Sequence, residues 1–238
     1  MTDIGGEVRL GSMLFTLVEP HRGHEVAYNR WYERDHFYAG CMVGPWLFAG
    51  RRFVATRALK GQRSGAEVDR FGGADRGSYL AAYWILDGRH DDHVDWALRQ
   101  VQWLHANGRM FAERDHVHTL MYRHAFTVGS SPVPAELALD HPFGGLTATL
   151  LRPAAGVDPS AVATVVDAEL LLGFTPIPLP ADAPVSQQGL DGIDGCLLTL
   201  GFSSTSPAPA ARHDGEVLWS APFVPTIPGT DAYVDQLW

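Results

Sequence analysis

The sequence predicts an α+β fold composed of two ferredoxin-like units in tandem, the second of which is degenerate. Segments with strand and helix character follow one another in the order β-α-β-β-α-β over residues 12–128, which is the split β-α-β plan. A linker rich in proline and alanine follows, and the order of elements then partly repeats. The predicted boundaries are 10–128 for the first unit, 129–143 for the linker and 144–238 for the second unit.

The first unit is expected to begin with a strand, a helix and a second strand. A short apolar run indicates the first strand, and apolar side chains near i, i+3, i+4 spacing indicate the helix. A loop containing glycine and proline separates this helix from a strand in which aromatic and aliphatic residues stand among arginines. These elements are expected over residues 12–18 (strand), 24–35 (helix), 40–45 (loop) and 47–59 (strand).

The rest of the first unit is expected to add a strand, a helix and a long strand. A polar, glycine-rich loop over 62–77 precedes a near-continuous apolar run that is typical of a central strand. Asp91-Asp92 place negative charge where a helix N-terminus favours it, and Asn107-Gly108 end that helix. The elements are expected over residues 78–86 (strand), 92–106 (helix) and 115–128 (strand).

The second unit repeats this order incompletely. Asp158-Pro159 places proline at the first position of a helix, which is expected to run to about Leu172 and to end at Gly173. Where a second helix should follow, residues 204–213 are instead rich in proline, alanine and serine. Strands are expected over residues 146–151, 174–179, 196–203 and 216–224.

Composition and charge exclude several classes of protein. The chain has a formal net charge of −9, so neither nucleic acid nor an anionic membrane surface is an expected partner. No apolar run reaches the roughly 20 residues that span a bilayer, and the N-terminus lacks the basic and apolar regions of a secretory signal. Cys41 and Cys196 are far apart and form no CxxC pattern, which favours reduced thiols in a cytoplasmic protein.

Residues 29–38 combine acids, arginines, aromatics and one histidine in a short segment. Because aromatics favour burial and charges favour water or partners, such a segment usually lines a pocket or caps a helix. His36 is the candidate general acid or base, since a neutral imidazole can take or give a proton near pH 7. The alternative is that His36 caps the end of the first helix, where a protonated ring complements the helix dipole.

Arginines and aromatics around this segment are further candidates. Arg51 and Arg52 alternate across the second strand, so only one of them can face inward, where it can bind a carboxylate, phosphate or enolate oxygen. Otherwise both pair with surface acids. Tyr32, Tyr38 and Trp46 are candidates for the wall of an apolar pocket that binds a ring-bearing ligand. Their alternative role is to pack a helix onto a sheet.

Two histidines stand two residues apart in the long strand, at His116 and His118. On a regular strand they share one face, and Tyr122 continues it. Such a pair can chelate a metal ion, but no third ligand stands out and the HExxH, CxxC and EF-hand spacings are absent, so no metal site is predicted. We expect instead that one of them serves the same pocket as His36. The motifs GxGxxG, GxxxxGK[ST] and GxSxG are also absent, which disfavours nucleotide-dependent and serine-hydrolase chemistry.

A short helix with the pattern WY…DH, followed by a loop and a strand with GRRF, resembles the EthD-like branch of the dimeric α+β barrel superfamily. The resemblance covers about residues 10–128. It implies a barrel of two ferredoxin-like units with a ligand cavity between sheet and helices, and relatives that are usually dimers. One departure is that Phe37-Tyr38 stands where such domains often have a proline. The matching residues are Trp31, Tyr32, His36, Gly50, Arg51, Arg52 and Phe53.

The resemblance implies a cofactor-independent cyclase, dehydratase or decarboxylase, because its relatives include such enzymes. We therefore expect a small cytoplasmic enzyme, a homodimer, that acts on a hydrophobic aromatic or polyketide-like substrate by general acid–base chemistry. The alternatives are a cofactor-free monooxygenase of an electron-rich phenol, a non-catalytic ligand-binding module, or a haem protein with His116 or His118 as axial ligand. The catalytic candidates are His36, Arg51 and Arg52, and the substrate-binding candidates are Tyr32, Tyr38, Trp46, His118 and Tyr122.

Overall fold

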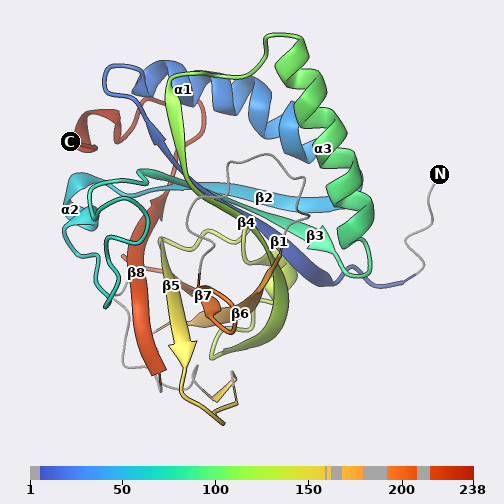
Figure 1. The fold of residues 1–238 in the computed structure, drawn as a ribbon, viewed down its shortest axis with the longest axis vertical. Coiled ribbons are helices and arrows are strands. Elements are labelled where there is room, and N and C mark those ends of the chain that lie inside the picture. The colour runs from blue at the N-terminus through green and yellow to red at the C-terminus, as the bar shows by residue number, and fades with distance from the viewer. Residues whose placement is uncertain (1–5, 159, 162–167, 179–191, 208–214) are drawn as a thin grey trace.

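Eight antiparallel strands close into a barrel within this single chain (Figure 1). The computed structural model describes residues 6–158, 160–161, 168–178, 192–207 and 215–238, and these ranges contain all eight strands. The order around the barrel is β1-β3-β2-β8-β5-β7-β6-β4, and β4 pairs with β1 to close it. The α+β class is therefore confirmed. The strands are β1 (Leu10–Pro20), β2 (Leu47–Val54), β3 (Tyr79–Leu86), β4 (Arg114–Gly129), β5 (Gly145–Pro153), β6 (Leu170–Ile177), β7 (Leu197–Ser203) and β8 (Gly215–Pro225).

Two helical segments lie together on one side of the strands of the first half, as Figure 1 shows. The first is α1 (Glu25–Trp31), which continues directly into the π-helical segment η1 (Tyr32–Met42), and the second is α3 (His90–Ala106). No helix in the part of the chain that the structure describes has the length and apolar character needed to cross a membrane. The remaining helical elements are short, namely α2 (Arg57–Lys60), η2 (Ala135–Leu137) and η4 (Val234–Gln236).

Two boundaries in the first half differ from the prediction. The second strand ends at Val54 rather than at residue 59, because the Thr56 hydroxyl accepts a hydrogen bond from the Leu59 amide at 3.4 Å and begins α2. The first helix does not end at residue 35 but continues as η1 to Met42, so the expected loop begins later. The segment that contains His36 is therefore helical on both sides of the histidine.

The second half departs further from the prediction. The helix expected over 158–172 is wrong at its C-terminal end, because the strand β6 already begins at Leu170. Gly173 does not end a helix but lies inside β6, where it pairs with Phe126 of β4. Part of that expected helix lies outside the described residues, namely residues 159 and 162–167. The same holds for residue 179 of the strand expected over 174–179 and for residues 208–213 of the segment over 204–213. The strands expected over 146–151, 196–203 and 216–224 are confirmed as β5, β7 and β8.

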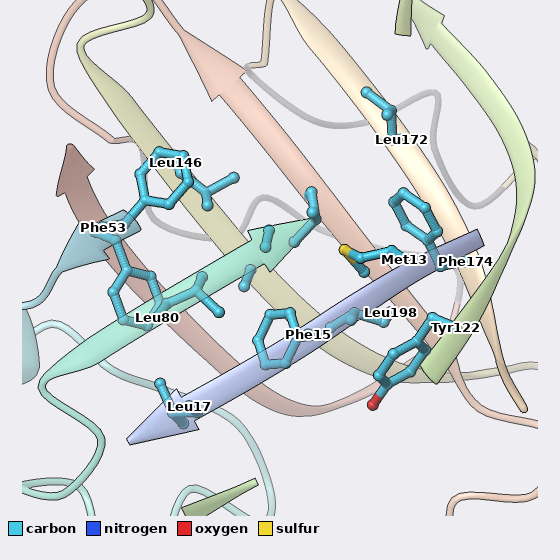
Figure 2. Packing of buried hydrophobic residues seen from close by; sticks show 14 of the residues in the cluster. Met13, Phe15, Leu17, Phe53, Leu80, Tyr122, Leu146, Leu172, Phe174 and Leu198 are labelled. Carbon is cyan, nitrogen blue, oxygen red and sulfur yellow. The ribbon is translucent and has the colours of Figure 1, made fainter. Parts of the chain in front are cut away.

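The barrel interior is a single apolar core to which both halves of the chain contribute (Figure 2). Alternation along β1 points Met13, Phe15 and Leu17 inward. The other face of the same sheet packs against α1 and η1, where Tyr79 and Tyr83 of β3 are fully buried. The sheet is thus covered on both faces, and the helix-covered face holds the cavity described below. Further interior side chains labelled in Figure 2 are Phe53, Leu80, Tyr122, Leu146, Leu172, Phe174 and Leu198.

Candidate functional site

A cavity of about 200 Å³ lies between the outer face of β1, β3 and β4 and the helical segments η1 and α3. Its wall is mainly apolar, which suits an organic ligand. Benzene fits an apolar cavity of roughly 150 Å³, whereas drug-sized ligands occupy pockets of about 300–1,000 Å³. The cavity therefore has room for a compound of one or two rings. The polar side chains on its wall include Thr16, Tyr32, His36, Arg114, His116 and Thr119.

A β-bulge in β4 decides which of its side chains reach this cavity. Leu17 of β1 pairs with His118, but the next residue, Val18, pairs with His116, so Val117 is the extra residue of the bulge. His116 consequently faces the cavity, while His118 faces the barrel interior. The expectation that the two histidines share one face is therefore wrong, because it assumed a regular strand.

His36 lies on η1 with its imidazole packed into the cavity wall. The ring stacks on Trp31 with a centroid distance of 4.4 Å and an interplanar angle of 19°, and it meets the Tyr32 ring edge-on at 5.3 Å. Gly40 lies one turn further along, and a Cβ atom there would approach Cε1 of the imidazole to 2.8 Å and Nδ1 to 2.9 Å. Glycine at residue 40 thus leaves the room that the His36 ring occupies.

The alternative in which His36 caps a helix end does not hold, because η1 continues for six residues beyond it to Met42. The adjacent Asp35 does not orient the ring either, since its carboxylate forms an ion pair with the Arg109 guanidinium. Nδ1 of His36 is buried and has no hydrogen-bond partner among the described residues. Within the described part of the chain, the imidazole is thus held by packing contacts with Trp31, Tyr32 and Gly40.

Burial keeps the His36 ring neutral at physiological pH. Desolvation, followed by the nearby charges of Arg114 and His116, lowers the pKa of His36 to about 3. Burial, followed by the charge of Arg114, lowers the pKa of His116 to about 4. His93 of α3 also lines the cavity, and burial lowers its pKa to about 4, so the cavity presents three neutral imidazoles to a ligand.

The low pKa of His36 predicts a pH-dependent stability. Its folded value of about 3 lies below the ordinary value of 6.5, so the unfolded chain binds more protons between these limits and stability falls as pH drops below 6.5. We expect His36→Gln to make the free energy of unfolding less dependent on pH, by up to about 1.4 kcal/mol per pH unit. Urea denaturation at pH 7, 6 and 5 measures this. The matched control is His105→Gln, because His105 is exposed. If the free energy of unfolding depended on pH equally in wild type and in His36→Gln, the lowered pKa of His36 would be contradicted.

His116 is oriented by a chain of two hydroxyls on the cavity wall. Its Nδ1 lies 2.9 Å from the Thr119 hydroxyl, which lies 2.8 Å from the Thr16 hydroxyl. Because a hydroxyl can donate or accept, this chain holds the ring in place and ties its tautomer to the direction of the two hydroxyl groups. Nε2 remains as the nitrogen that is not engaged in this chain.

Arg114 is a cavity residue that sequence reasoning missed. It begins β4 and lies half-buried on the cavity wall, with its guanidinium carbon 4.8 Å from the Trp31 ring centroid. It stands two residues before His116, so strand alternation already places the two on one face. The spacing of Arg114 and His116 could have predicted that they share one face, but the prediction considered only the pair His116 and His118.

The two arginines predicted as catalytic lie elsewhere. Arg51 donates hydrogen bonds to the backbone carbonyls of Leu139 and His141, and Arg52 is buried beneath α1, where it contacts Asn29. The prediction that they point to opposite sides of the strand is confirmed, but neither lines the cavity. The arginine on the cavity wall is Arg114.

The predicted binding residues also separate. Tyr32 lines the cavity, and its hydroxyl lies 2.9 Å from that of Tyr83. Tyr38 is 54% exposed on the outer surface, and Trp46 lies half-buried under the Arg89 guanidinium, 4.3 Å from it. Neither of these two reaches the cavity.

His118 and Tyr122 form a pair inside the barrel. His118 Nε2 lies 2.7 Å from the Tyr122 hydroxyl, and Phe15 and Phe71 pack against the His118 ring. Both side chains are buried in the interior core rather than in the cavity beneath the helices. Of the predicted site residues, the cavity therefore brings together His36 and Tyr32.

Comparison with known proteins adds no assignment. No protein-family model matches the sequence, and no curated protein matches it significantly. Among the described residues, no group of three or more His, Cys, Asp or Glu side chains is arranged to hold a metal ion.

Proposed function

We propose that this protein is a cofactor-independent enzyme that moves a proton at a carbon next to a carbonyl group in a small, hydrophobic, ring-bearing substrate. The observation that carries the proposal is the neutral His36 imidazole on the wall of an apolar cavity, whose buried Nδ1 has no hydrogen-bond partner among the residues that the structure describes. The buried, unpartnered ring nitrogen is Nδ1, so we assign the other nitrogen, Nε2, as the one that a ligand reaches. A positioned base of this kind contributes roughly 100- to 10,000-fold to a rate.

In the proposed step, Nε2 of His36 takes the proton from the carbon next to the carbonyl group. The electron pair of the broken C–H bond is delocalised onto the carbonyl oxygen, which gives an enolate. A base with a low pKa needs a nearby negative charge to become protonated, and the enolate supplies it. The Tyr32 hydroxyl is the donor for the enolate oxygen, since burial raises the pKa of Tyr32 and keeps its proton in place. Dehydration follows when a neighbouring hydroxyl group leaves as water with the proton that His36 carries, and cyclisation follows when the enolate carbon attacks a second carbonyl group and His36 protonates the new alkoxide. In a decarboxylation, His36 takes the proton of a β-keto acid, loss of CO2 forms the enolate, and the same proton returns to carbon.

The fold is consistent with the tandem architecture that we include in this proposal. In the first half the neighbouring strands run β4-β1-β3-β2, and in the second half they run β8-β5-β7-β6. Each half thus follows the order fourth, first, third, second, which is the strand order of a ferredoxin-like unit. This repetition supports two ferredoxin-like units and the resemblance to the EthD-like branch.

The proton transfer can be tested without the natural substrate. In D2O, 1-phenylpropan-2-one exchanges the protons next to its carbonyl, and NMR follows the loss of their signal. We expect the protein to accelerate this exchange and His36→Gln to reduce the acceleration by about 100-fold or more, while His105→Gln leaves it unchanged. Equal acceleration by wild type and His36→Gln would rule out the proposed base.

A second variant separates chemistry from folding. Gly40→Ala should displace the His36 ring, because the new Cβ atom would lie 2.8 Å from Cε1. Alanine has the higher helix propensity, so a slower exchange in this variant cannot come from a weaker helix. Oxygen uptake with a phenol in the same samples tests the monooxygenase alternative. If the protein binds the ketone but does not accelerate its proton exchange, the result would favour a non-catalytic ligand-binding module.

A further inference from the structure

We propose that Arg114 forms a carboxylate-binding subsite in the cavity, so that the substrate is a small aromatic acid. The inference rests on the proposed function for the reaction, but the binding that it predicts does not require turnover. It narrows the substrate from any hydrophobic ring compound to one that carries a carboxylate beside an apolar ring.

The first observation is that Arg114 lacks a counterion. Among the described residues, its guanidinium forms no ion pair and donates no hydrogen bond, and it lies against the Trp31 ring. The adjacent Asp115 is already paired, with Arg76 at 2.5 Å and with His21. The positive charge of Arg114 is therefore uncompensated at the wall of the cavity.

Other arginines show that this is not the general pattern of the chain. Arg52 pairs with Glu33, and Arg109 pairs with Asp35. A half-buried cation without a partner is unfavourable, which makes the guanidinium of Arg114 a ready site for an anion. Its planar, forked donors match the two oxygens of a carboxylate.

The second observation is the shape and lining of the space beside Arg114. The volume of about 200 Å³ admits one or two rings, and the side chains opposite are apolar. An inorganic anion would leave that apolar wall without a contact, whereas an aromatic acid fills both the charged and the apolar part. The ring of the ligand would contact α3 residues, including Val94, Leu98 and Val101.

The subsite has a consequence for His36. The charge of Arg114 is one of the factors that lower the pKa of this histidine. A bound carboxylate compensates that charge, so the pKa of His36 rises toward its ordinary value and the imidazole becomes a stronger base. Binding of the correct substrate thus strengthens the base that acts on it.

Ligand binding to the intact protein tests the inference. Affinities for benzoate, benzyl alcohol, acetate and inorganic phosphate are measured by NMR titration for wild type, Arg114→Met and Arg114→Lys. We expect wild type to bind benzoate most tightly. Arg114→Met should weaken benzoate binding by roughly 10- to 100-fold while benzyl alcohol binding stays unchanged, and Arg114→Lys should retain part of the preference.

A second readout follows the His36 ring. Its pKa, measured by NMR, should rise when benzoate binds to wild type and should not respond to benzoate in Arg114→Met. The inference is overturned if wild type binds benzyl alcohol as tightly as benzoate, if phosphate or acetate binds as tightly as benzoate, or if Arg114→Met leaves the preference intact. The wild-type comparison needs no variant, so it decides even if Arg114→Met does not fold.

The two proposals can fail separately. Exchange that depends on His36 without a preference for benzoate would keep the proposed function and remove the subsite. A preference for benzoate that depends on Arg114, together with exchange that is indifferent to His36, would keep the subsite and remove the base.

Discussion

Replacing Arg52 with alanine is expected to lower the free energy of unfolding by about 3–5 kcal/mol, the cost of removing one partner of a buried ion pair. Arg52 is 4% exposed, and it donates to the Glu33 carboxylate at 3.1 Å and to the Asn29 side-chain oxygen at 2.8 Å. Its guanidinium carbon also lies 4.4 Å from the Tyr32 ring centroid and 5.0 Å from that of Tyr79. Alanine would remove these contacts and leave a carboxylate largely buried without its cation.

The loss should extend to the cavity, because Arg52 connects β2 to the helical segment that carries Tyr32 and His36. Urea denaturation measures the effect on stability. Arg30→Ala is the matched control, since Arg30 pairs with Asp231 on the exposed surface at 2.9 Å and such pairs contribute about 0–1 kcal/mol. An Arg52→Ala protein that unfolds within about 1 kcal/mol of wild type would contradict this role.

The positions of Arg51 and Arg52 show what could be predicted from the sequence. Alternation along a strand requires them to face opposite sides, and they do. Which side holds the cavity depends on where the helices pack, and that is set by contacts between distant parts of the chain, such as Tyr28 of α1 with Tyr79 of β3. The pattern therefore identified the strand but not the arginine that reaches the cavity.

The bulge at Val117 marks the limit of local reasoning about β4. Nothing in the residues 115–118 distinguishes a bulged strand from a regular one, since the extra residue is defined by its pairing with β1. The bulge places His116 and His118 on opposite faces of β4, so that only His116 of the two lines the cavity. In the same way, Gly40 was expected to begin a loop, whereas it lies inside η1 and its lack of a side chain leaves room for the His36 ring.

A buried carboxylate at the end of β1 contacts the residues on both sides of the loop over 62–77. The carboxylate of Glu19, at the end of β1, accepts hydrogen bonds from the Ser78 amide at 2.7 Å and from the Ser78 hydroxyl at 2.8 Å. It lies 3.8 Å from Nζ of Lys60, and both charged residues are buried. Lys60 in turn donates to the Leu237 carbonyl at 3.2 Å. One carboxylate thus holds together segments from three distant parts of the sequence.

We expect Glu19→Ala to destabilise the fold by about 3–5 kcal/mol, because it leaves the Lys60 ammonium and the Ser78 amide buried without their acceptor. Lys60→Met should also destabilise it, but the double variant should be more stable than the sum of the two effects, since no unpaired charge remains. Urea denaturation of the four proteins gives the coupling free energy, which we expect to exceed about 1 kcal/mol. Strictly additive effects would mean that the two charges do not stabilise each other, and that the hydrogen bonds of Ser78 alone account for the burial of Glu19.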